Sequence, residues 1–173
     1  MLIPITLPTK AEKLGYHSQI VMNGRIVNDS MGAYVADMAV HKMIEAGQAP
    51  KKSKVVILGL TFKENCPDIR NSKVDDIVRK LNTYGIKPAV VDPWANGAEA
   101  MHEYGIRLVD IEEVSDADCV IVAVAHHEFK ELGLEGIKKL YRDGEDTEKV
   151  LIDVKGLYKV TDLKKSGLKW WRL

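Results

Sequence analysis

Short, strongly apolar runs recur along the chain from residue 54 onward, and the segments between them follow helical spacing. The runs are KVVILGLT (54–61), KPAVVDP (87–93), DCVIVAVA (118–125) and KVLIDVKG (149–156). Helices are predicted over 72–85, 96–105 and 133–144, and further strands over 106–110 and 168–173. Continuous apolar runs, without in-out alternation, indicate strands that are covered on both faces. The pattern therefore predicts an α/β fold with a doubly wound, mostly parallel sheet.

A long amphipathic helix is predicted ahead of this sheet. The sequence SMGAYVADMAVHKMIEAG begins at Ser30, and its apolar residues fall at helical spacing: Met31, Val35, Met38, Ala39 and Met43. Asp29 or Ser30 fits the N-cap of such a helix, and Gly47 fits the residue that ends it. The Met and Ala face of this helix, residues 29–46, needs a partner surface, which is either a second copy of the chain or its own sheet.

The domain organisation follows from a change of pattern near residue 50. The chain has 173 residues, which suits one well-packed domain with an appendage. The segment QAPKKSK (48–54) is polar, contains a proline and has no periodicity, so we expect a linker. The predicted parts are residues 1–50, with the long helix, and residues 51–173, with the sheet.

The charge balance excludes partners that are recognised by a bulk electrostatic field. The chain carries 25 Lys and Arg and 25 Asp and Glu, so we expect neither nucleic-acid nor membrane binding. No uncharged run approaches the ~18 residues that span a bilayer, and the start MLIPITLPTK does not resemble a signal peptide. The two cysteines, Cys66 and Cys119, show no metal-ligand spacing and fit a reducing compartment. We therefore expect a soluble cytoplasmic protein.

Polar side chains collect where the predicted strands end. In an open parallel sheet, ligands bind outside the carboxyl ends of the strands. The loops there carry Lys63, Arg70, Asp92, His126, His127 and Lys155. Several cations near the start of a helix at Ser72 fit a phosphate site, although solvated lysines and a simple helix cap explain the same residues about equally well.

Other functional interpretations of these loops are weaker. A dinucleotide fold needs Gly-x-Gly-x-x-Gly after its first strand, and GLTFKE retains only Gly59, so an independent NAD site is disfavoured. Adjacent residues on an extended segment point to opposite sides, so a surface or capping role for His126 and His127 is favoured over a metal site. Cys66 has no evident local base and fits an inert loop thiol better than a nucleophile. The pair Trp170–Trp171 is expected to close a core or an interface on one side.

Motifs along almost the whole chain resemble the UDP-glucose/GDP-mannose dehydrogenase family. They are KAEKLGYH (10–17), NGRIVNDSMG (23–32), GLTFKENCPDIRNSKV (59–74), VDPWA (91–95), VAVAHHEFK (122–130) and IDVKGLY (152–158). The run FKENxPDIRNSK is the most specific of these, and the pattern is most similar to the branch that acts on UDP-N-acetyl-mannosamine, -glucosamine or -galactosamine. This family oxidises the C6 hydroxyl of a nucleotide sugar to a carboxylate with two NAD.

The resemblance implies a Rossmann-like UDP-binding domain preceded by the dimerisation helix of the family. It identifies Lys63 as a contact to the nucleotide sugar and Arg70 as a residue that orders the loop or reaches the diphosphate. Lys155 takes the place of a basic residue near the substrate, and Arg25 is a weaker candidate for a contact across an interface. Neither the NAD fingerprint nor the catalytic cysteine loop of the family is found in the sequence, so the resemblance implies no catalytic residue and no metal in this chain.

The sequence thus supports the hypothesis of a UDP-sugar binding and dimerisation part of an NAD-dependent nucleotide-sugar 6-dehydrogenase. Such a chain is expected to be inactive alone and to bind no NAD tightly, because the cofactor belongs to the complete enzyme or to a separate NAD-domain partner. A homodimer through helix 29–46 is part of the same hypothesis. The alternative is a non-catalytic nucleotide-binding or interaction module that has kept the fold.

Overall fold

The computed structural model describes residues 19–173, and the chain divides into two compact units between Met31 and Gly32. The long helix α2 (Gln19–Glu45) contributes residues to both units. The elements of the second unit after α2 are β1 (Val55–Leu58), α3 (Val74–Thr83), β2 (Ala89–Val91), α4 (Gly97–Tyr104), β3 (Cys119–Val122), α5 (His127–Lys138), β4 (Val150–Asp153), α6 (Val160–Lys165) and β5 (Lys169–Arg172). Short 3-10 turns cover Pro50–Lys52, Ile111–Glu113 and Asp146–Glu148.

The sheet of the second unit is parallel throughout, in the order β2-β1-β3-β4-β5. In register, Leu58 lies beside Val91 on one side and beside Val122 on the other, so the carboxyl ends of β2, β1 and β3 are level. Asp153 and Arg172 end the next two strands at the same level. This confirms the predicted doubly wound α/β fold and brings the loops that follow the strands to one edge.

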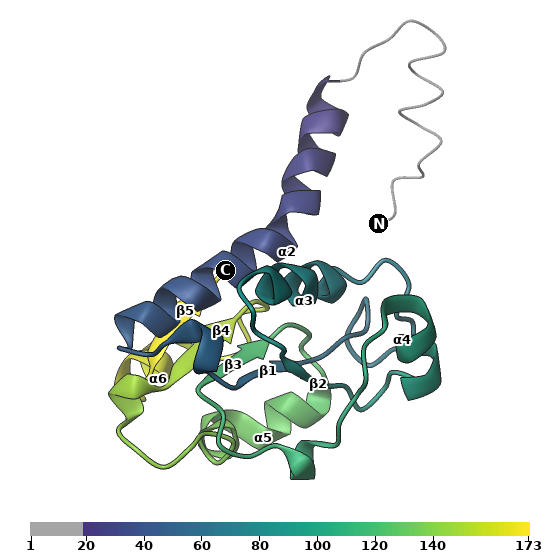
Figure 1. Ribbon diagram of the computed structural model, residues 1–173. Helices are drawn as coiled ribbons and strands as arrows, with labels where there is room; N and C mark the ends of the chain where they lie inside the picture. The colour runs from purple at the N-terminus through teal and green to yellow at the C-terminus, as the bar shows by residue number, and fades with distance from the viewer. Residues whose placement is uncertain (1–18) are drawn as a thin grey trace, which may run out of the picture. The chain divides into compact units, whose positions relative to one another are not determined.

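Alternate residues of each strand face two separate apolar layers. Ile57, Ile121 and Ile152 face a layer with α3, and Val56 and Val120 face a layer with α5. The helices lie on opposite sides of the sheet in Figure 1. Because β1, β3 and β4 are buried along their whole length, the continuous apolar runs in the sequence are explained by burial on both faces.

The second half of α2 belongs to the core of the second unit. Val35, Ala36, Ala39 and Met43 are buried in the same apolar cluster as β1 and α3. Packing of this stretch on its own sheet, the option left open above, is therefore present. The helix ends as predicted, since Gly47 takes a left-handed φ of 75° and donates its N–H to the carbonyl of Ile44.

The predicted N-cap at Asp29 or Ser30 is wrong, because α2 already begins at Gln19. The Ser30 hydroxyl donates to the carbonyl of Val27 within the helix, at 2.8 Å. Serine often binds a carbonyl of the preceding turn in this way when it lies inside a helix. Neither this helix nor any other in the described part of the chain is both long and apolar enough to cross a membrane.

Two other predicted elements differ from the structure. The segment 106–110 contributes only an isolated bridge, between Leu108 and Val90, and forms no strand. The helix predicted over 133–144 begins earlier, at His127, and ends at Lys138. Gly133 interrupts it with a φ of 62° and a ψ of −179°, a conformation that is open mainly to glycine.

The edge strand β5 confirms the prediction for the end of the sequence, but its two tryptophans do not share a side. Trp170 packs against the layer with α5 and α6, and Trp171 packs against the layer with α3. The ring of Trp171 also meets Tyr34 of α2 edge-on, with centroids 5.7 Å apart. Alternation along a strand separates neighbouring side chains, so each tryptophan covers one layer.

Candidate functional site

The loop between β1 and α3, residues 59–73, is the centre of the candidate site, and we call it the Lys63 loop. It starts at Gly59, whose N–H donates to the carbonyl of Val91 at the end of β2 (2.7 Å). The N–H of Phe62 donates to the carbonyl of Asp68 (2.8 Å), which closes the loop on itself. These backbone bonds give the polar loop a defined shape at the carboxyl edge of the sheet.

A buried carboxylate fixes the start of this loop. Asp92 directly follows β2 and is 9% exposed. Its Oδ2 accepts hydrogen bonds from the N–H groups of Leu60 (2.5 Å) and Thr61 (2.8 Å). Its Oδ1 accepts from the N–H groups of Trp94 (2.8 Å) and Ala95 (2.9 Å). One side chain therefore ties the loop after β1 to the loop after β2.

These hydrogen bonds determine the charge of Asp92. Burial disfavours the carboxylate, but the bonds from His126 and from the backbone N–H groups outweigh it and lower the pKa of Asp92 from 3.8 to about 2. Asp92 is thus an anion at neutral pH, and all of its partners lie inside the protein. Asp92 therefore connects the loops after β1 and β2 from the interior of the protein.

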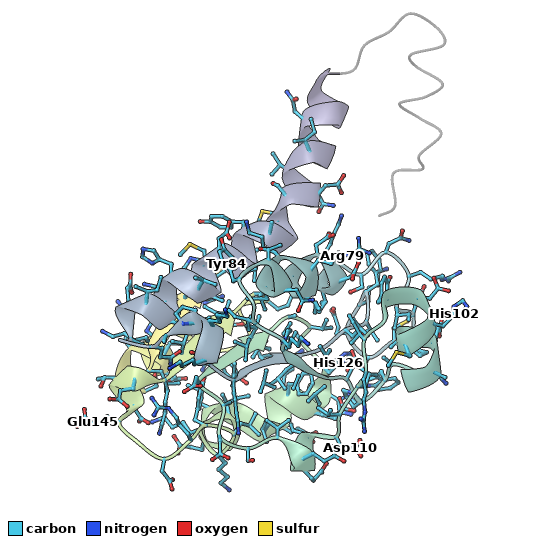
Figure 2. All side chains as sticks on the ribbon, viewed as in Figure 1. Arg79, Tyr84, His102, Asp110, His126 and Glu145 are labelled. Atoms are coloured by element: carbon cyan, nitrogen blue, oxygen red, sulfur yellow. The ribbon has the colours of Figure 1, made fainter. Side chains whose placement is uncertain are left out.

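His126 supports the Lys63 loop from the interior of the protein and is 0% exposed. Its Nε2 lies 3.0 Å from the Thr61 hydroxyl and 3.2 Å from Oδ2 of Asp92, and its Nδ1 accepts a hydrogen bond from the N–H of Asn65 (2.9 Å). The Trp94 ring stacks near the imidazole, with an interplanar angle of 18°. Figure 2 shows His126 within the body of the unit, whereas His102 lies at its surface.

Asp92 and His126 are buried beneath the loops, so the surface role favoured for His126 is wrong, and Asp92 does not lie on the exposed rim with the lysines. Neighbouring His127 is exposed, so the two histidines do point to different sides as predicted. Within the described residues no cluster of three or more histidine, cysteine or acidic side chains could hold a metal ion. The strand-by-strand pattern of the sequence did not reveal that these polar residues bond to one another.

A second buried carboxylate orders the loop after β4, residues 154–159, which we call the Lys155 loop. Asp153 is 0% exposed, and its two carboxylate oxygens accept hydrogen bonds from the N–H groups of Leu157 (2.8 Å) and Tyr158 (3.0 Å). Lys155 lies exposed within the segment that Asp153 closes. In both the Lys63 loop and the Lys155 loop, a buried aspartate that accepts backbone N–H groups therefore fixes the shape of the loop.

The candidate cations differ in how strongly they are engaged. Arg70 is bound by Asp68, with Nε to Oδ1 and Nη2 to Oδ2 both at 2.9 Å, and this pair lowers the pKa of Asp68 to about 2. Lys63 is exposed, and its Nζ lies 5.8 Å from the ring centre of Phe62. Among the described side chains, neither Lys63 nor Lys155 pairs with a carboxylate. Among the candidate cations whose side chains the structure describes, these two lysines are the ones left available to an anion.

Both lysines lie at the same edge of the sheet. β1 and β4 flank β3, so their carboxyl ends are separated by about 10 Å, twice the usual strand spacing. The N-terminus of α3 contributes less than expected, because Asp75 and Asp76 occupy its first turn and oppose a phosphate there. A candidate anion site here would therefore rest on lysine side chains more than on a helix end.

The turn after β1 does not fit a dinucleotide. In a dinucleotide fold, backbone N–H groups of this turn meet the pyrophosphate. Here the N–H groups of Leu60 and Thr61 are already taken by Asp92. Gly59 serves a different purpose, since its φ is 98° and a Cβ there would lie 2.9 Å from the backbone nitrogen of Val124. Where the glycine fingerprint is missing from the sequence, the turn directs these two N–H groups to a side chain of the protein.

The remaining candidates take no part in this arrangement of described side chains. Cys119 is buried in β3, and burial raises the pKa of its thiol well above the usual range. Cys66 is half-buried in the Lys63 loop as a free thiol. Arg25 lies in the first half of α2, and its side chain is outside the described part of the structure.

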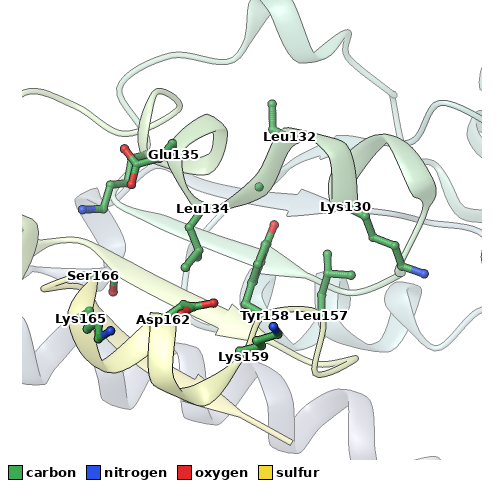
Figure 3. A pocket seen from close by; sticks show the side chains of 12 residues that line it. Lys130, Leu132, Leu134, Glu135, Leu157, Tyr158, Lys159, Asp162, Lys165 and Ser166 are labelled. Carbon is green, nitrogen blue, oxygen red and sulfur yellow. The ribbon is translucent and has the colours of Figure 1, made fainter.

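A cavity of 580 Å³ opens between α5 and α6 (Figure 3). Its lining includes Leu134, Tyr158 and the exposed lysines Lys130, Lys159 and Lys165. It contains none of Lys63, Arg70 and Lys155. The cavity is therefore distinct in its lining from the residues that the sequence pointed to.

Comparison with known proteins identifies the family. Residues 56–160 match the model of the UDP-glucose/GDP-mannose dehydrogenase family, UDP binding domain. The chain is 47% identical over 154 residues to a UDP-N-acetyl-D-glucosamine 6-dehydrogenase of Pseudomonas aeruginosa, covering 89% of this chain and 36% of the relative. It is 42% identical to an enzyme of the same name from Salmonella typhi, covering 88% of this chain and 35% of that protein.

A solved structure shows the same fold. It is an NDP-N-acetyl-D-galactosaminuronic acid dehydrogenase of Methanosarcina mazei, with a TM-score of 0.78 and 24% identity over 90% of this chain and 31% of that one. The chain thus spans about a third of the length of the relatives it matches. The match over residues 56–160 covers the Lys63 loop and most of the parallel sheet. The chain therefore belongs to the UDP-glucose/GDP-mannose dehydrogenase family, of which it carries the UDP binding domain.

Proposed function

We propose that this chain binds the uridine diphosphate part of a UDP-sugar at the carboxyl edge of its sheet. In the complete protein it serves an NAD-dependent 6-dehydrogenase that acts on a UDP-N-acetylhexosamine of the mannosamine, glucosamine or galactosamine type. The family match and the names of the relatives support this proposal. Lys63, Arg70, Lys155 and Arg25 are the proposed substrate-binding residues.

The observation that carries the proposal is the state of the two lysines. Lys63 and Lys155 are exposed on loops whose backbones are held by the buried carboxylates Asp92 and Asp153. Because the backbone of each loop is already fixed, only the lysine side chain has to be ordered when it meets a diphosphate, so more of the interaction appears as affinity. Arg70 differs from the two lysines because Asp68 already holds it, so its proposed contribution is to order the Lys63 loop or to reach the diphosphate from this paired state.

Replacing Lys63 tests this assignment. The substitution Lys63→Ala removes a charge-assisted hydrogen bond to the diphosphate, and we expect the affinity for UDP to fall by about tenfold or more. Isothermal titration calorimetry of the purified chain with UDP measures the effect. The loss should shrink as the salt concentration rises, because an exposed ion pair is screened.

Lys165→Ala is the matched control for this experiment. Lys165 is also an exposed lysine, but it lines the cavity between α5 and α6. We expect it to leave UDP binding unchanged. An effect of Lys165→Ala with none of Lys63→Ala would move the nucleotide site to that cavity, and no UDP binding by the unsubstituted chain would contradict the proposal itself.

Hydride transfer lies outside what this chain is proposed to do alone. The N–H groups of the turn after β1 are engaged by Asp92, so NAD is assigned to another part of the complete protein or to a separate partner. NAD bound there would supply the hydride acceptor for oxidation at C6 of the sugar. The residues of this chain would hold the nucleotide end of the substrate while the reaction takes place elsewhere.

A homodimer through helix α2 is the proposed assembly. Within residues 29–46, Tyr34 and Ile44 are 48% and 60% exposed. Apolar side chains repeated along one helix favour a helical partner. Light scattering should give about twice the 19.3 kDa of one chain, and Ile44→Glu should shift the protein toward the monomer. A monomer at high concentration without any substitution would rule the dimer out.

A further inference from the structure

The hydrogen bonds of His126 define which of its nitrogens carries the proton. The N–H of Asn65 donates to Nδ1, so Nδ1 bears no hydrogen. The proton of the neutral imidazole is therefore on Nε2, which faces the Thr61 hydroxyl and Oδ2 of Asp92. The Thr61 hydroxyl in turn donates to the carbonyl of Lys63 (3.0 Å), which leaves its oxygen free to accept from His126.

These contacts reach the backbone on both sides of Lys63. On one side, the Thr61 hydroxyl, beside Nε2 of His126, itself holds the Lys63 carbonyl, and on the other side His126 accepts the N–H of Asn65. Asn65 has a φ of 55°, a left-handed conformation that asparagine tolerates better than most residues but that still costs free energy relative to glycine. Its side chain supports this conformation by accepting the N–H of His127 (3.0 Å).

We propose that His126, with its proton on Nε2, is a positioning residue that sets the place of the Lys63 ammonium for the diphosphate. It does not touch the ligand, because it is fully buried. It acts by holding the short stretch from Thr61 to Asn65 in one conformation. This inference rests on the proposed function, because the position of Lys63 that His126 sets is part of the same proposed nucleotide site.

Two substitutions separate the contacts of the imidazole. His126→Asn places an amide oxygen where Nδ1 lies, so it can still accept the N–H of Asn65 but does not reach Asp92. His126→Gln places its amide near Nε2, so it can still bond Asp92 but offers nothing to Asn65. Each variant loses one side of the imidazole, which makes them matched controls for general loss of stability.

The experiment combines UDP calorimetry with amide hydrogen exchange at Asn65. We expect His126→Asn to bind UDP within about threefold of the unsubstituted chain and to keep the Asn65 amide protected. We expect His126→Gln to lose about tenfold in affinity and to exchange rapidly at Asn65. The ¹⁵N spectrum of the unsubstituted chain should show a protonated Nε2 and an unprotonated Nδ1 on His126.

The outcomes distinguish the positioning role of His126 from UDP binding by the chain. Equal weakening by both variants, or full UDP affinity in His126→Gln, overturns the positioning role and leaves UDP binding in place. A protonated Nδ1 in the ¹⁵N spectrum overturns the inference even if neither variant folds. Absence of UDP binding by the unsubstituted chain overturns the proposed function, and the positioning role then falls with it.

Discussion

Asp92→Asn should destabilise the protein by about 3 kcal/mol at neutral pH, measured as the free energy of unfolding in urea. The carboxylate accepts from two N–H groups on Oδ2, and Nε2 of His126 lies 3.2 Å from the same oxygen. An amide cannot satisfy this set, because whichever side its NH₂ takes, a donor meets backbone donors in the interior. Asp143→Asn, which changes an exposed carboxylate, is the matched control and should have little effect.

The same substitution should remove part of the acid sensitivity of the fold. The pKa of Asp92 is lowered from 3.8 to about 2 in the folded chain, so the unfolded chain binds a proton first as the pH falls. The resulting stability, about 2 kcal/mol, is fully present above pH ~4 and is lost as the pH falls toward 2. Unfolding free energies at pH 5 and pH 2.5 should differ less in Asp92→Asn than in the unsubstituted chain. An identical pH dependence would show that Asp92 does not carry this charge.

Gly59→Ala should also cost about 3 kcal/mol or more in unfolding free energy. Gly59 has a φ of 98°, and a Cβ there would meet both the side chain and the backbone nitrogen of Val124, the latter at 2.9 Å. The end of β1 would have to move away from the end of β3, and the Lys63 loop with it. We therefore expect weaker UDP binding in the same variant.

Gly105→Ala separates the conformational part of this cost from the steric part. Gly105 ends α4 with a φ of 66°, and a Cβ there would meet nothing within 4 Å. Its replacement should cost about 1 kcal/mol, which is the penalty for the left-handed backbone alone. If Gly59→Ala proved no more destabilising than Gly105→Ala in urea unfolding, the close approach to Val124 would not be a constraint on this turn.

The fold could be predicted from the sequence because burial on both faces leaves a local trace. VVIL and CVIV are continuous apolar runs, VLID is apolar up to Asp153, and each became a central strand. The errors arose where a distant or backbone effect decided the outcome. The Asn28-Asp29-Ser30 sequence fits a cap but lies inside a helix, and Gly133 breaks a helix without ending it.

The candidate site could be predicted only in part. The sequence placed the polar residues at the carboxyl edge, which the register of the strands confirms. It could not show that Asp92 and His126 bond to each other, because their 34-residue separation carries no local pattern. One local signal was present: an aspartate before Pro93-Trp94-Ala95 fits a side chain that accepts the N–H groups two and three residues on, as Asp92 does.

The two buried carboxylates have a consequence for how this surface can evolve. Asp92 and Asp153 set the backbone of their loops from the inner side, through bonds to N–H groups that every residue except proline possesses. Outward-facing side chains of the Lys63 and Lys155 loops can therefore be exchanged without changing the hydrogen bonds that give the loops their shape. The outward side chains set which ligand is preferred, and the buried hydrogen bonds set how the loops fold. Point substitutions of the outward side chains can therefore change the ligand during evolution while the loop conformation is inherited unchanged.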